Sequence, residues 1–388
     1  LQLNNRYNLS PQSLTLPKYY LIPKWHKSFP PLKTRAICDN SNSINKELYQ
    51  ILSVILKFLK KHYTNYYGKK KEFGQKLCNF SIDSTDSCLL LLNRLNMDNA
   101  HINCIYTRDI KNMFMSFEFN TIISAMKSII KLCFTNSKSI YLAFRNNKCY
   151  YTNTLDSNHL TFDENTLLQL IIDIIENSYI SLGGLIFLQK CGVSMGSSYS
   201  PIICDLICTY YENVYFDNPS NCSKLDFPLI RYADDVLMFN TKLDWYAEIY
   251  PQCLIFEADN NEDGSEVNFL DINLKISNNK ILTTLYSKLR HINISKFNDN
   301  FCSDNNLKES LICNIIYGQI IRYFKICHNF TNFKYNLSLL IKKFRKNGYQ
   351  PYIINKAIRK FISNYFNSFS FKYSLKSKHD MIFQAILN

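Results

Sequence analysis

Apolar residues recur at helical spacing in several separate stretches of the chain. The first stretch spans residues 43–71 and has one apolar face, formed by Leu48, Ile51, Leu52, Ile55, Leu56 and Leu59. Residues 84–95 predict a second helix, with Ser84 or Thr85 as its N-cap. Helical stretches follow over 122–180, around an insert rich in Asn, Lys and Tyr at 144–154. Beyond residue 291 the pattern is helical again, with Gly348 as a helix-ending residue.

A different pattern occupies residues 227–239, where apolar residues lie on both sides of two adjacent aspartates. This pattern predicts two buried strands joined by a tight turn at Ala233, Asp234 and Asp235. Two carboxylates at the tip of an apolar hairpin are costly unless a partner compensates them, and a divalent metal is the usual partner. The alternative is a surface hairpin whose turn residues happen to be acidic.

Two other extended segments carry candidate chemistry. Residues 103–109 form a short β-prone run that ends at Asp109, with Phe114 in the helix-like stretch that follows. Residues 16–37 predict a β-hairpin from which Lys24, Lys27 and Arg35 project. Lysine as a point charge and arginine as a bidentate fork both suit a triphosphate. The plainer alternatives are a helix-capping Asp109 with Phe114 in the core, and a basic surface loop.

Small residues are concentrated at 187–201, immediately before an expected helix. Gly192, Gly196 and several serines precede Pro201, which would stand in the first helical turn. Small residues let a backbone approach a ligand closely, so this stretch is a candidate binding loop. The alternative is an ordinary glycine-rich lead-in to a helix.

The net charge of +14 is placed unevenly along the 388 residues. From Lys308 to the end there are fourteen Lys and Arg against two acids, Glu309 and Asp380, which leaves about +2 for everything before. A basic C-terminal part beside a near-neutral remainder predicts a polyanionic partner, and a solvated helical surface is the alternative. The length allows two or three subdomains.

Composition also bears on location. No run of eighteen apolar residues is present, so no membrane span is expected. Leu1–Asn5 does not have the pattern of a signal peptide, and the missing initiator Met is consistent with a fragment or a processed product. The fourteen cysteines include no CxxC pair, and the spacing of Cys204 and Cys208 suits one helix face. We therefore expect buried thiols and an intracellular protein, nuclear or cytoplasmic and not secreted.

The sequence Tyr232-Ala233-Asp234-Asp235 resembles motif C of reverse transcriptases, and Asp109-Ile110 resembles their motif A. Residues 187–201 resemble motif B, a Gln…Gly-x-x-Met-Gly…Ser-Pro pattern matched here by Gln189, Gly192, Met195, Gly196, Ser200 and Pro201.

Further matches lie on either side of these motifs. Pro23-Lys24 and Arg35 resemble the fingers motifs of Penelope-like and telomerase-type enzymes, although Ala36 replaces the usual proline. The segment around Asp271 and residues 283–288 resembles the Penelope-like region after motif C. The resemblance covers four blocks in the family's order, without a GIY-YIG endonuclease or an RNase H set of acids after them.

The resemblance implies an α+β right-hand polymerase. Residues 1–102 would form the fingers, 103–290 a palm with a small antiparallel sheet, and 291–388 a basic helical thumb. A helical insertion would occupy about 120–185 of the palm. Two Mg²⁺ ions, with Mn²⁺ as an accepted substitute, would bind the carboxylates of Asp109, Asp234 and Asp235 and the backbone carbonyl of Ile110.

The same resemblance implies roles for the other matched residues. Phe114 would lie under the incoming sugar and favour dNTPs over rNTPs. The full dNTP-binding set would be Lys24, Lys27, Arg35, Phe114 and Gln189. The template and primer would contact Gly192, Met195, Gly196, Ser200, Pro201, Tyr232 and Lys288. We expect Asp271 to be structural rather than a third catalytic acid.

The predicted function is that of an RNA-directed DNA polymerase that extends a primer 3′-OH with dNTPs. Its partners would be an RNA template and a DNA primer, and its origin a Penelope-like retroelement or a gene derived from one. One alternative is a telomerase-like or RNA-copying polymerase with the same palm. Another is a domesticated nucleic-acid-binding protein without activity.

Overall fold

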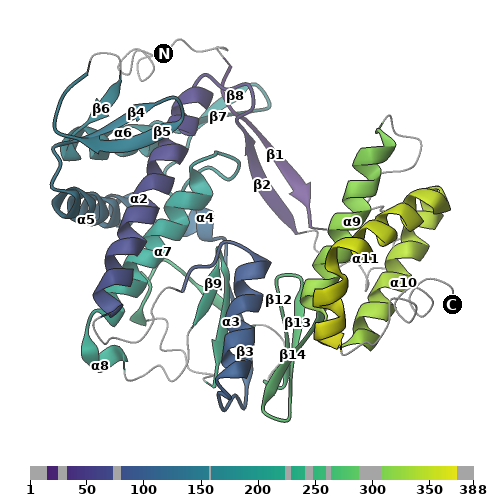
Figure 1. Cartoon of the computed structure of the whole chain (residues 1–388). Coiled ribbons are helices and arrows are strands. Elements are labelled where there is room, and N and C mark those ends of the chain that lie inside the picture. The colour runs from purple at the N-terminus through teal and green to yellow at the C-terminus, as the bar shows by residue number, and fades with distance from the viewer. Residues whose placement is uncertain are drawn as a thin grey trace. The chain divides into compact units, whose positions relative to one another are not determined.

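The computed structural model describes residues 15–24, 33–72, 80–156, 159–222, 229–240, 248–258, 264–287 and 307–373. By its internal packing the chain divides into two units. Unit 1 comprises Leu1–Ile82 and Tyr106–Asn260, and unit 2 comprises Asp83–Ile105 and Asn261–Asn388. Helices and small, mainly antiparallel sheets alternate along the chain, which confirms the predicted α+β class (Figure 1). The division into fingers, palm and thumb stays a prediction.

Helix α2 (Lys46–Glu72) is the long helix expected from the apolar stripe that begins at Leu48. Leu52, Ile55, Leu56 and Leu59 on this stripe are fully buried. The helix packs on α5 (Phe119–Ser137) and α7 (Ser200–Phe216), and α6 (Glu164–Glu176) packs on α5. Helix α7 is buried along most of its length, so it forms the centre of unit 1.

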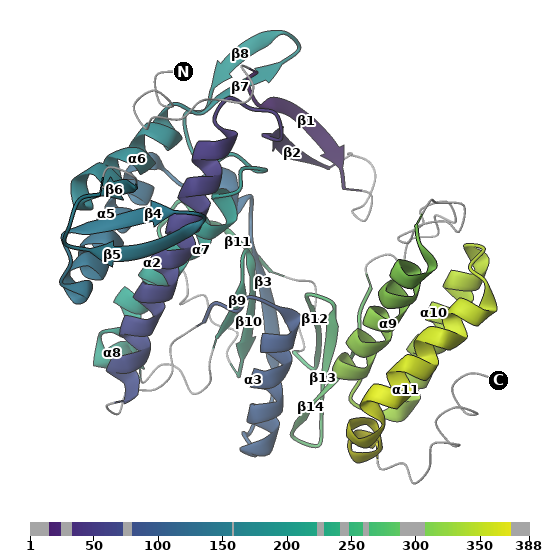
Figure 2. The same cartoon turned by 45° about the horizontal axis from the view of Figure 1, so that its top comes forward.

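Among the described residues of unit 1, strands form two four-stranded sheets beside these helices. The first has the order β11-β3-β10-β9, formed by Phe256–Ala258, Ile105–Ile110, Asp235–Phe239 and Ile230–Tyr232. The second has the order β2-β1-β7-β8, formed by Thr34–Asp39, Lys18–Pro23, Tyr179–Leu182 and Leu185–Leu188. Strands β1 and β2 pair antiparallel over their full length, which confirms the hairpin predicted near the N-terminus (Figure 2).

The insertion predicted to be helical also contains strands. Between α5 and α6 lies a three-stranded sheet, with the order β5-β4-β6, formed by Lys148–Thr152, Tyr141–Arg145 and Leu160–Phe162. Its β4–β5 hairpin turns at Asn146 and Asn147, both in the left-handed region with φ of 49° and 57°. Asparagine tolerates that conformation, and two such residues in a row form a two-residue hairpin turn. This turn signal was available in the sequence and was missed.

Unit 2 begins with α3 (Thr85–Met97), whose N-cap is Ser84, as predicted. The Ser87 N–H donates to Ser84 Oγ at 3.2 Å. A meander of β12 (Glu266–Phe269), β13 (Ile272–Ser277) and β14 (Lys280–Leu285) follows. In the described part of unit 2 the meander is followed by α9 (Glu309–Ile326), α10 (Phe330–Lys346) and α11 (Pro351–Tyr373).

Two expectations from composition can be compared with the structure. Among the described residues, no helix combines the length and apolar character needed to cross a membrane. The cysteines that the structure describes are free thiols, and Cys204 and Cys208 are both buried on α7, in agreement with their spacing. Burial raises the pKa of the Cys208 thiol to about 12, so this thiol is protonated and unreactive at neutral pH.

Candidate polymerase site

The two adjacent aspartates lie at the tip of the β9–β10 hairpin. Tyr232 pairs with Asp235, so Ala233 and Asp234 form the turn and Asp235 begins strand β10. The predicted turn is therefore confirmed, but it is one residue shorter than expected. Ala233 has φ of 52°, in the left-handed region that side chains with a Cβ disfavour. The buried residues of β10 hold this strained turn in place.

Strand β3 brings the third aspartate beside the hairpin. The Ile110 N–H donates to the Asp234 carbonyl at 2.8 Å, and β3 is the neighbour of β10 in the sheet. Asp109 on β3 therefore lies beside the turn that carries Asp234, although the two residues are far apart in sequence. The side chain of Ile110 is fully buried, so only its backbone is available to a ligand.

The carboxylates of Asp109 and Asp234 can be compared with the ways in which proteins bind Mg²⁺. Within the described ranges, no group of three or more His, Cys, Asp or Glu side chains is gathered closely enough to bind a metal ion by itself. Mg²⁺ commonly binds one or two carboxylates and completes its shell with water and substrate phosphates. Carboxylates at Asp109 on β3 and at Asp234 in the adjoining turn fit that mode of binding.

An ion pair that the sequence did not reveal lies next to Asp109. Glu257 on β11 is the register partner of Asp109, and like charges directly opposite each other repel. The Lys111 ammonium lies 2.9 Å from Glu257 Oε1 and balances this second acid. Neither residue stands in a recognisable motif, because their meeting depends on strand pairing.

Gly192 docks the predicted binding loop on the segment that follows Asp109. The Gly192 N–H donates to the Phe117 carbonyl and the Val193 N–H to the Phe114 carbonyl, both at 2.7 Å. Gly192 has φ of +69°, and an added Cβ would lie 2.4 Å from the Phe114 carbonyl oxygen. Only glycine permits this backbone-to-backbone contact.

Gly196 joins the same loop to the N-terminal hairpin. The Cys38 N–H on β2 donates to the Met195 carbonyl at 2.7 Å. An added Cβ on Gly196, whose φ is +117°, would lie 2.2 Å from the Cys38 carbonyl oxygen. The loop thus connects β2 with the segment after Asp109, so three of the four blocks found in sequence meet in space.

Gln189, Ser194 and Ser200 form hydrogen bonds within this loop. Gln189 Nε2 donates to the Cys191 carbonyl at 2.8 Å, and Gln189 Oε1 accepts from Ser194 Oγ at 2.7 Å. Ser200 is fully buried and donates to the Ser194 carbonyl at 2.7 Å. Gln189 and Ser200, predicted to contact nucleotide or template, brace the loop in this structure. Pro201 is exposed in the first turn of α7.

The remaining predicted residues have simpler surroundings. The Lys24 N–H donates to the Lys33 carbonyl at 2.8 Å and closes the β1–β2 hairpin. Arg35 on β2 and Tyr232 are exposed, and Phe114 is half-buried. Lys27 and Lys288 lie outside the described residues.

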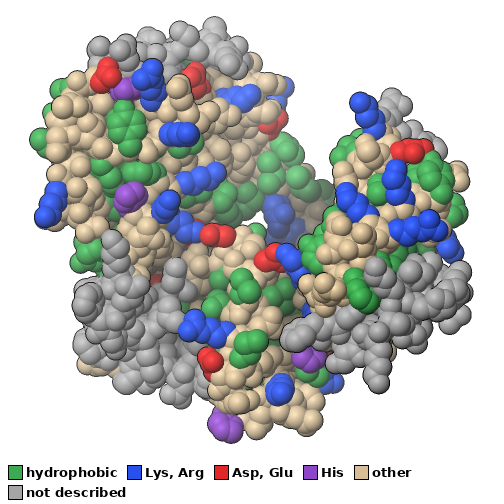
Figure 3. All heavy atoms as spheres, in the orientation of Figure 1, with side chains coloured by type: hydrophobic (Ala, Val, Ile, Leu, Met, Phe, Trp, Pro, Cys, Tyr) green, Lys and Arg blue, Asp and Glu red, His purple; other side chains and the backbone are tan. Residues whose placement is uncertain are grey.

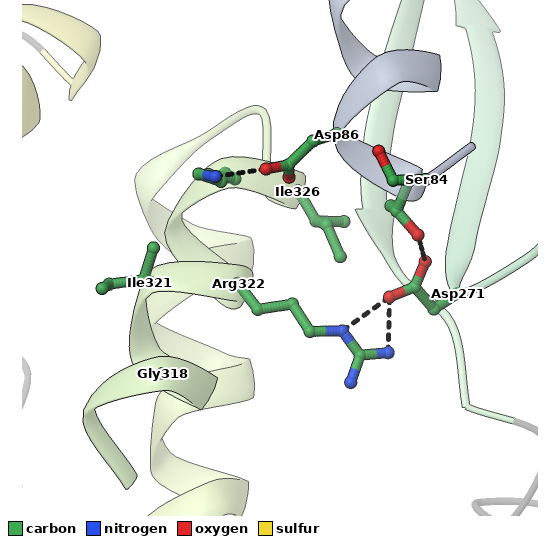
Figure 4. Close-up of a pocket in the computed structure, with 9 residues that line it drawn as sticks. Ser84, Asp86, Asp271, Gly318, Ile321, Arg322 and Ile326 are labelled. Carbon is green, nitrogen blue, oxygen red and sulfur yellow. Dashed lines mark hydrogen bonds and ion pairs between the residues drawn. The ribbon is translucent and has the colours of Figure 1, made fainter. Parts of the chain in front are cut away.

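Asp271 has a structural role, as expected. In unit 2 the Arg322 guanidinium ion-pairs with its carboxylate, with Arg322 Nε 2.6 Å from Asp271 Oδ2 (Figure 4). Thr85 Oγ1 donates to the other carboxylate oxygen at 2.7 Å. These groups line a cavity of about 330 Å³ that Ser84 and Ile326 also border. The carboxylate joins α9 to the β12–β13 turn and to α3.

A buried ionic cluster lies beneath the turn that carries Asp234. Arg231 is fully buried and pairs with Glu212 and with Asp205, whose Oδ1 lies 2.7 Å from Arg231 Nη1. The Lys60 ammonium lies 2.8 Å from Asp205 Oδ2. Burial alone would raise the pKa of Asp205, but the Arg231 and Lys60 cations lower it to about 2.

Residues 308–373 of unit 2, which include α9–α11, carry most of the net positive charge of the chain. Figure 3 shows Lys and Arg side chains gathered over α9–α11. From residue 308 to residue 373 the only acid is Glu309, against these cations: Lys308, Arg322, Lys325, Lys334, Lys342, Lys343, Arg345, Lys346, Lys356, Arg359, Lys360 and Lys372. Such a surface favours a polyanionic ligand.

Comparison with protein families gives a match to one part of the chain. A family model described as the animal helix-turn-helix domain matches residues 303–359, which include α9, α10 and the first part of α11. No curated protein matches the chain.

Solved structures match more of it. A telomerase from Candida albicans, in complex with the TWJ fragment of telomeric RNA, has a TM-score of 0.62 at 14% identity, over 97% of this chain and 63% of that chain. Apo telomerase from Candida tropicalis has a TM-score of 0.49 at 17% identity, over 98% and 62%. A sicinivirus 3Dpol RNA-dependent RNA polymerase has a TM-score of 0.41 at 11% identity, over 74% and 56%.

The likeness to the Candida albicans telomerase shows that this chain has a right-hand polymerase fold, as the sequence predicted. The chain spans less than two thirds of the length of the telomerases that it matches.

Proposed function

We propose that this protein is a nucleic-acid polymerase, and specifically an RNA-directed DNA polymerase that extends a primer 3′-OH. The observation that supports the proposal is the bond between the Ile110 N–H and the Asp234 carbonyl, because it joins the strand of Asp109 to the turn of Asp234. In a right-hand polymerase fold, paired carboxylates at this edge are suited to nucleotidyl transfer.

Asp109 and Asp234 would hold Mg²⁺, with Asp235 and the Ile110 carbonyl as further ligands. The metal would supply activation of the primer hydroxyl and charge neutralisation on the triphosphate. Lys24 and the exposed Arg35 would bind the outer phosphates, where positive charge stabilises the transition state. The loop at Gly192 and Gly196 would position the base pair being formed, because its backbone is rigidly docked.

Unit 2 would hold the template–primer duplex. Residues 308–373, which include α9–α11, contain twelve cations and one acid. Phosphate contacts of this kind make binding strong and dependent on salt. The Candida albicans telomerase, which shares the fold, was solved with telomeric RNA, and this supports RNA as a partner.

Two choices within this proposal concern the template and the origin of the chain. A telomerase-like or RNA-copying polymerase would use the same palm, and sugar selectivity separates the RNA-copying enzyme from a reverse transcriptase. We propose a Penelope-like origin on the motif resemblance alone. A domesticated protein that binds nucleic acid without activity is the alternative from another class.

The test is primer extension on a defined RNA template with a DNA primer, Mg²⁺ and either dNTPs or rNTPs. We expect extension with dNTPs, and its loss in Asp234→Asn with duplex binding retained. Asp98→Asn is the matched control, because it makes the same chemical change at a side chain that is 67% exposed and paired only at 4.0 Å with Arg94. Full activity in Asp234→Asn would reject the assignment, and tight binding without extension in the unaltered chain would favour the binding protein.

A further inference from the structure

Arg231, immediately before the Tyr232-Ala233-Asp234-Asp235 sequence, has an unusual environment for an arginine. Its side chain is fully buried beneath the β9–β10 hairpin. All three of its side-chain nitrogens donate to partners on α7: Nη1 to Asp205, Nε and Nη2 to Glu212, and Nη2 to Thr209 Oγ1 at 3.0 Å. The guanidinium therefore ties strand β9 to the central helix of unit 1.

The cluster around Arg231 is balanced in charge. Two cations, Arg231 and Lys60, face two anions, Asp205 and Glu212. The Tyr250 hydroxyl completes it by donating to Glu212 Oε1 at 2.7 Å. Replacing a buried ionic group of this kind with apolar side chains is often neutral or stabilising, so stability alone does not account for it.

One further bond leads from Arg231 to the turn. Arg231 Nη1 lies 3.4 Å from the Ala233 carbonyl oxygen, and the next carbonyl, that of Asp234, accepts from the Ile110 N–H at 2.8 Å. Two successive carbonyls are thus held by two different elements. These two contacts restrain the peptide groups on both sides of Asp234 Cα, from which the carboxylate projects.

The turn needs such support because its backbone is strained. Ala233 has φ of 52°, and the left-handed conformation costs an alanine roughly 1 kcal/mol. The contact with Arg231 restrains the Ala233–Asp234 peptide, whose rotation would change ψ of Ala233 and φ of Asp234 and so move the Asp234 carboxylate.

The cluster also connects the turn to the glycine loop. Asp205 and Glu212 lie on α7, and α7 begins at Ser200, immediately after the loop that contains Gly192 and Gly196. The same helix therefore sets the position of the loop and, through Arg231, the position of the turn.

We propose that Arg231 is a positioning residue that clamps the Ala233 carbonyl to α7 and so holds Asp234 in register with the glycine loop. The consequence for catalysis rests on the proposed function, but the clamp itself is a physical property that can be measured without activity.

The first measurement is hydrogen–deuterium exchange of the peptide that covers residues 229–240. Arg231→Lys keeps the charge, but a single ammonium cannot span Asp205, Glu212 and the Ala233 carbonyl. Tyr250→Phe is the matched control, because it removes a hydrogen bond from the same cluster and leaves the turn untouched. We expect exchange in this peptide to be about tenfold faster in Arg231→Lys than in Tyr250→Phe, with equal exchange in α7. Equal exchange of the hairpin in the two variants would reject the proposal that Arg231 holds the Ala233 carbonyl.

A second variant covers the case in which Arg231→Lys does not fold. Arg231→Met combined with Glu212→Gln removes one cation and one anion, and leaves Asp205 paired with Lys60. It also lacks the bond to Ala233, so the same faster exchange is expected in the hairpin. Exchange as slow as in the unaltered protein would reject the proposal.

Primer extension then distinguishes the positioning role of Arg231 from the proposed polymerase function. We expect Arg231→Lys to lower kcat about 10- to 100-fold, as loss of a residue supporting a metal ligand commonly does, with little change in KM for the nucleotide. Normal kcat in this variant would overturn the positioning role. If the unaltered chain does not extend primers but the hairpin is selectively loosened by Arg231→Lys, the proposed function fails and the clamp stands.

Discussion

Gly192 offers the sharpest test of how the site is assembled. An alanine Cβ at this position would lie 2.4 Å from the Phe114 carbonyl oxygen and 2.6 Å from Met115 Cα. Both are backbone atoms, which cannot turn away as a side chain can. Gly192→Ala therefore forces the loop away from the segment after Asp109 and weakens the bonds from Gly192 and Val193.

The size of the effect has two parts. The left-handed backbone, with φ of +69°, costs alanine about 1 kcal/mol. Forcing an extra methyl group into a closed contact costs about 1–3 kcal/mol more. A total of about 3 kcal/mol corresponds to roughly 6 to 12 °C in Tm for a folding unit of this size.

Gly183→Ala is the matched control. Gly183 lies in the turn between β7 and β8 with φ of +58°, and an added Cβ would have nothing within 4 Å. This variant carries only the backbone cost of about 1 kcal/mol, or roughly 2 to 4 °C. The difference between the two variants measures the clash itself.

The assay is thermal unfolding of both variants, followed by primer extension well below either Tm. We expect Gly192→Ala to show the larger fall in Tm of the two variants. Its extension rate should fall about 100-fold, because small displacements of positioned groups slow catalysis strongly. Gly183→Ala should keep its rate. Equal Tm shifts in the two variants would refute the close-contact argument, and an undiminished rate in Gly192→Ala would remove the loop from the site.

Two other predictions concern substrate choice and pH. Phe114→Val should reduce the preference for dNTPs over rNTPs by about tenfold or more, measured as the ratio of kcat/KM values, because a smaller side chain leaves room for a 2′-OH; an unchanged ratio would remove Phe114 from sugar selection. The pKa of Asp205 is lowered to about 2, so the stabilising ionised form is lost as pH falls from the ordinary carboxyl value of 3.8 toward 2. The free energy of unfolding should fall over that range, and it should fall less steeply in Asp205→Asn when measured by denaturant titration; the same slope in both proteins would contradict the assignment.

Local patterns in the sequence were enough to predict several elements of this protein. The apolar stripe that begins at Leu48 predicted α2, Ser84 predicted the start of α3, and the apolar residues flanking Asp234 predicted the β9–β10 hairpin. The physical reason is that helical periodicity, capping and turn preference depend on neighbours within a few residues. The sheet between α5 and α6 was missed because the paired asparagines at its turn were interpreted only as part of a polar insert.

Only the tertiary structure decided which distant segments meet. The bond from Ile110 to Asp234, the close contact of Gly192 with Phe114, and the burial of Arg231 each join segments that are well separated in sequence. A charged residue in a sequence gives no indication of the partner that it will find, or of whether water will reach it. Those outcomes depend on how helices and sheets pack, because burial changes both the strength of an ion pair and the cost of leaving a charge alone. The motifs could therefore be recognised in the sequence. The contacts of Arg231 that support the turn of Asp234 became apparent only in the tertiary structure.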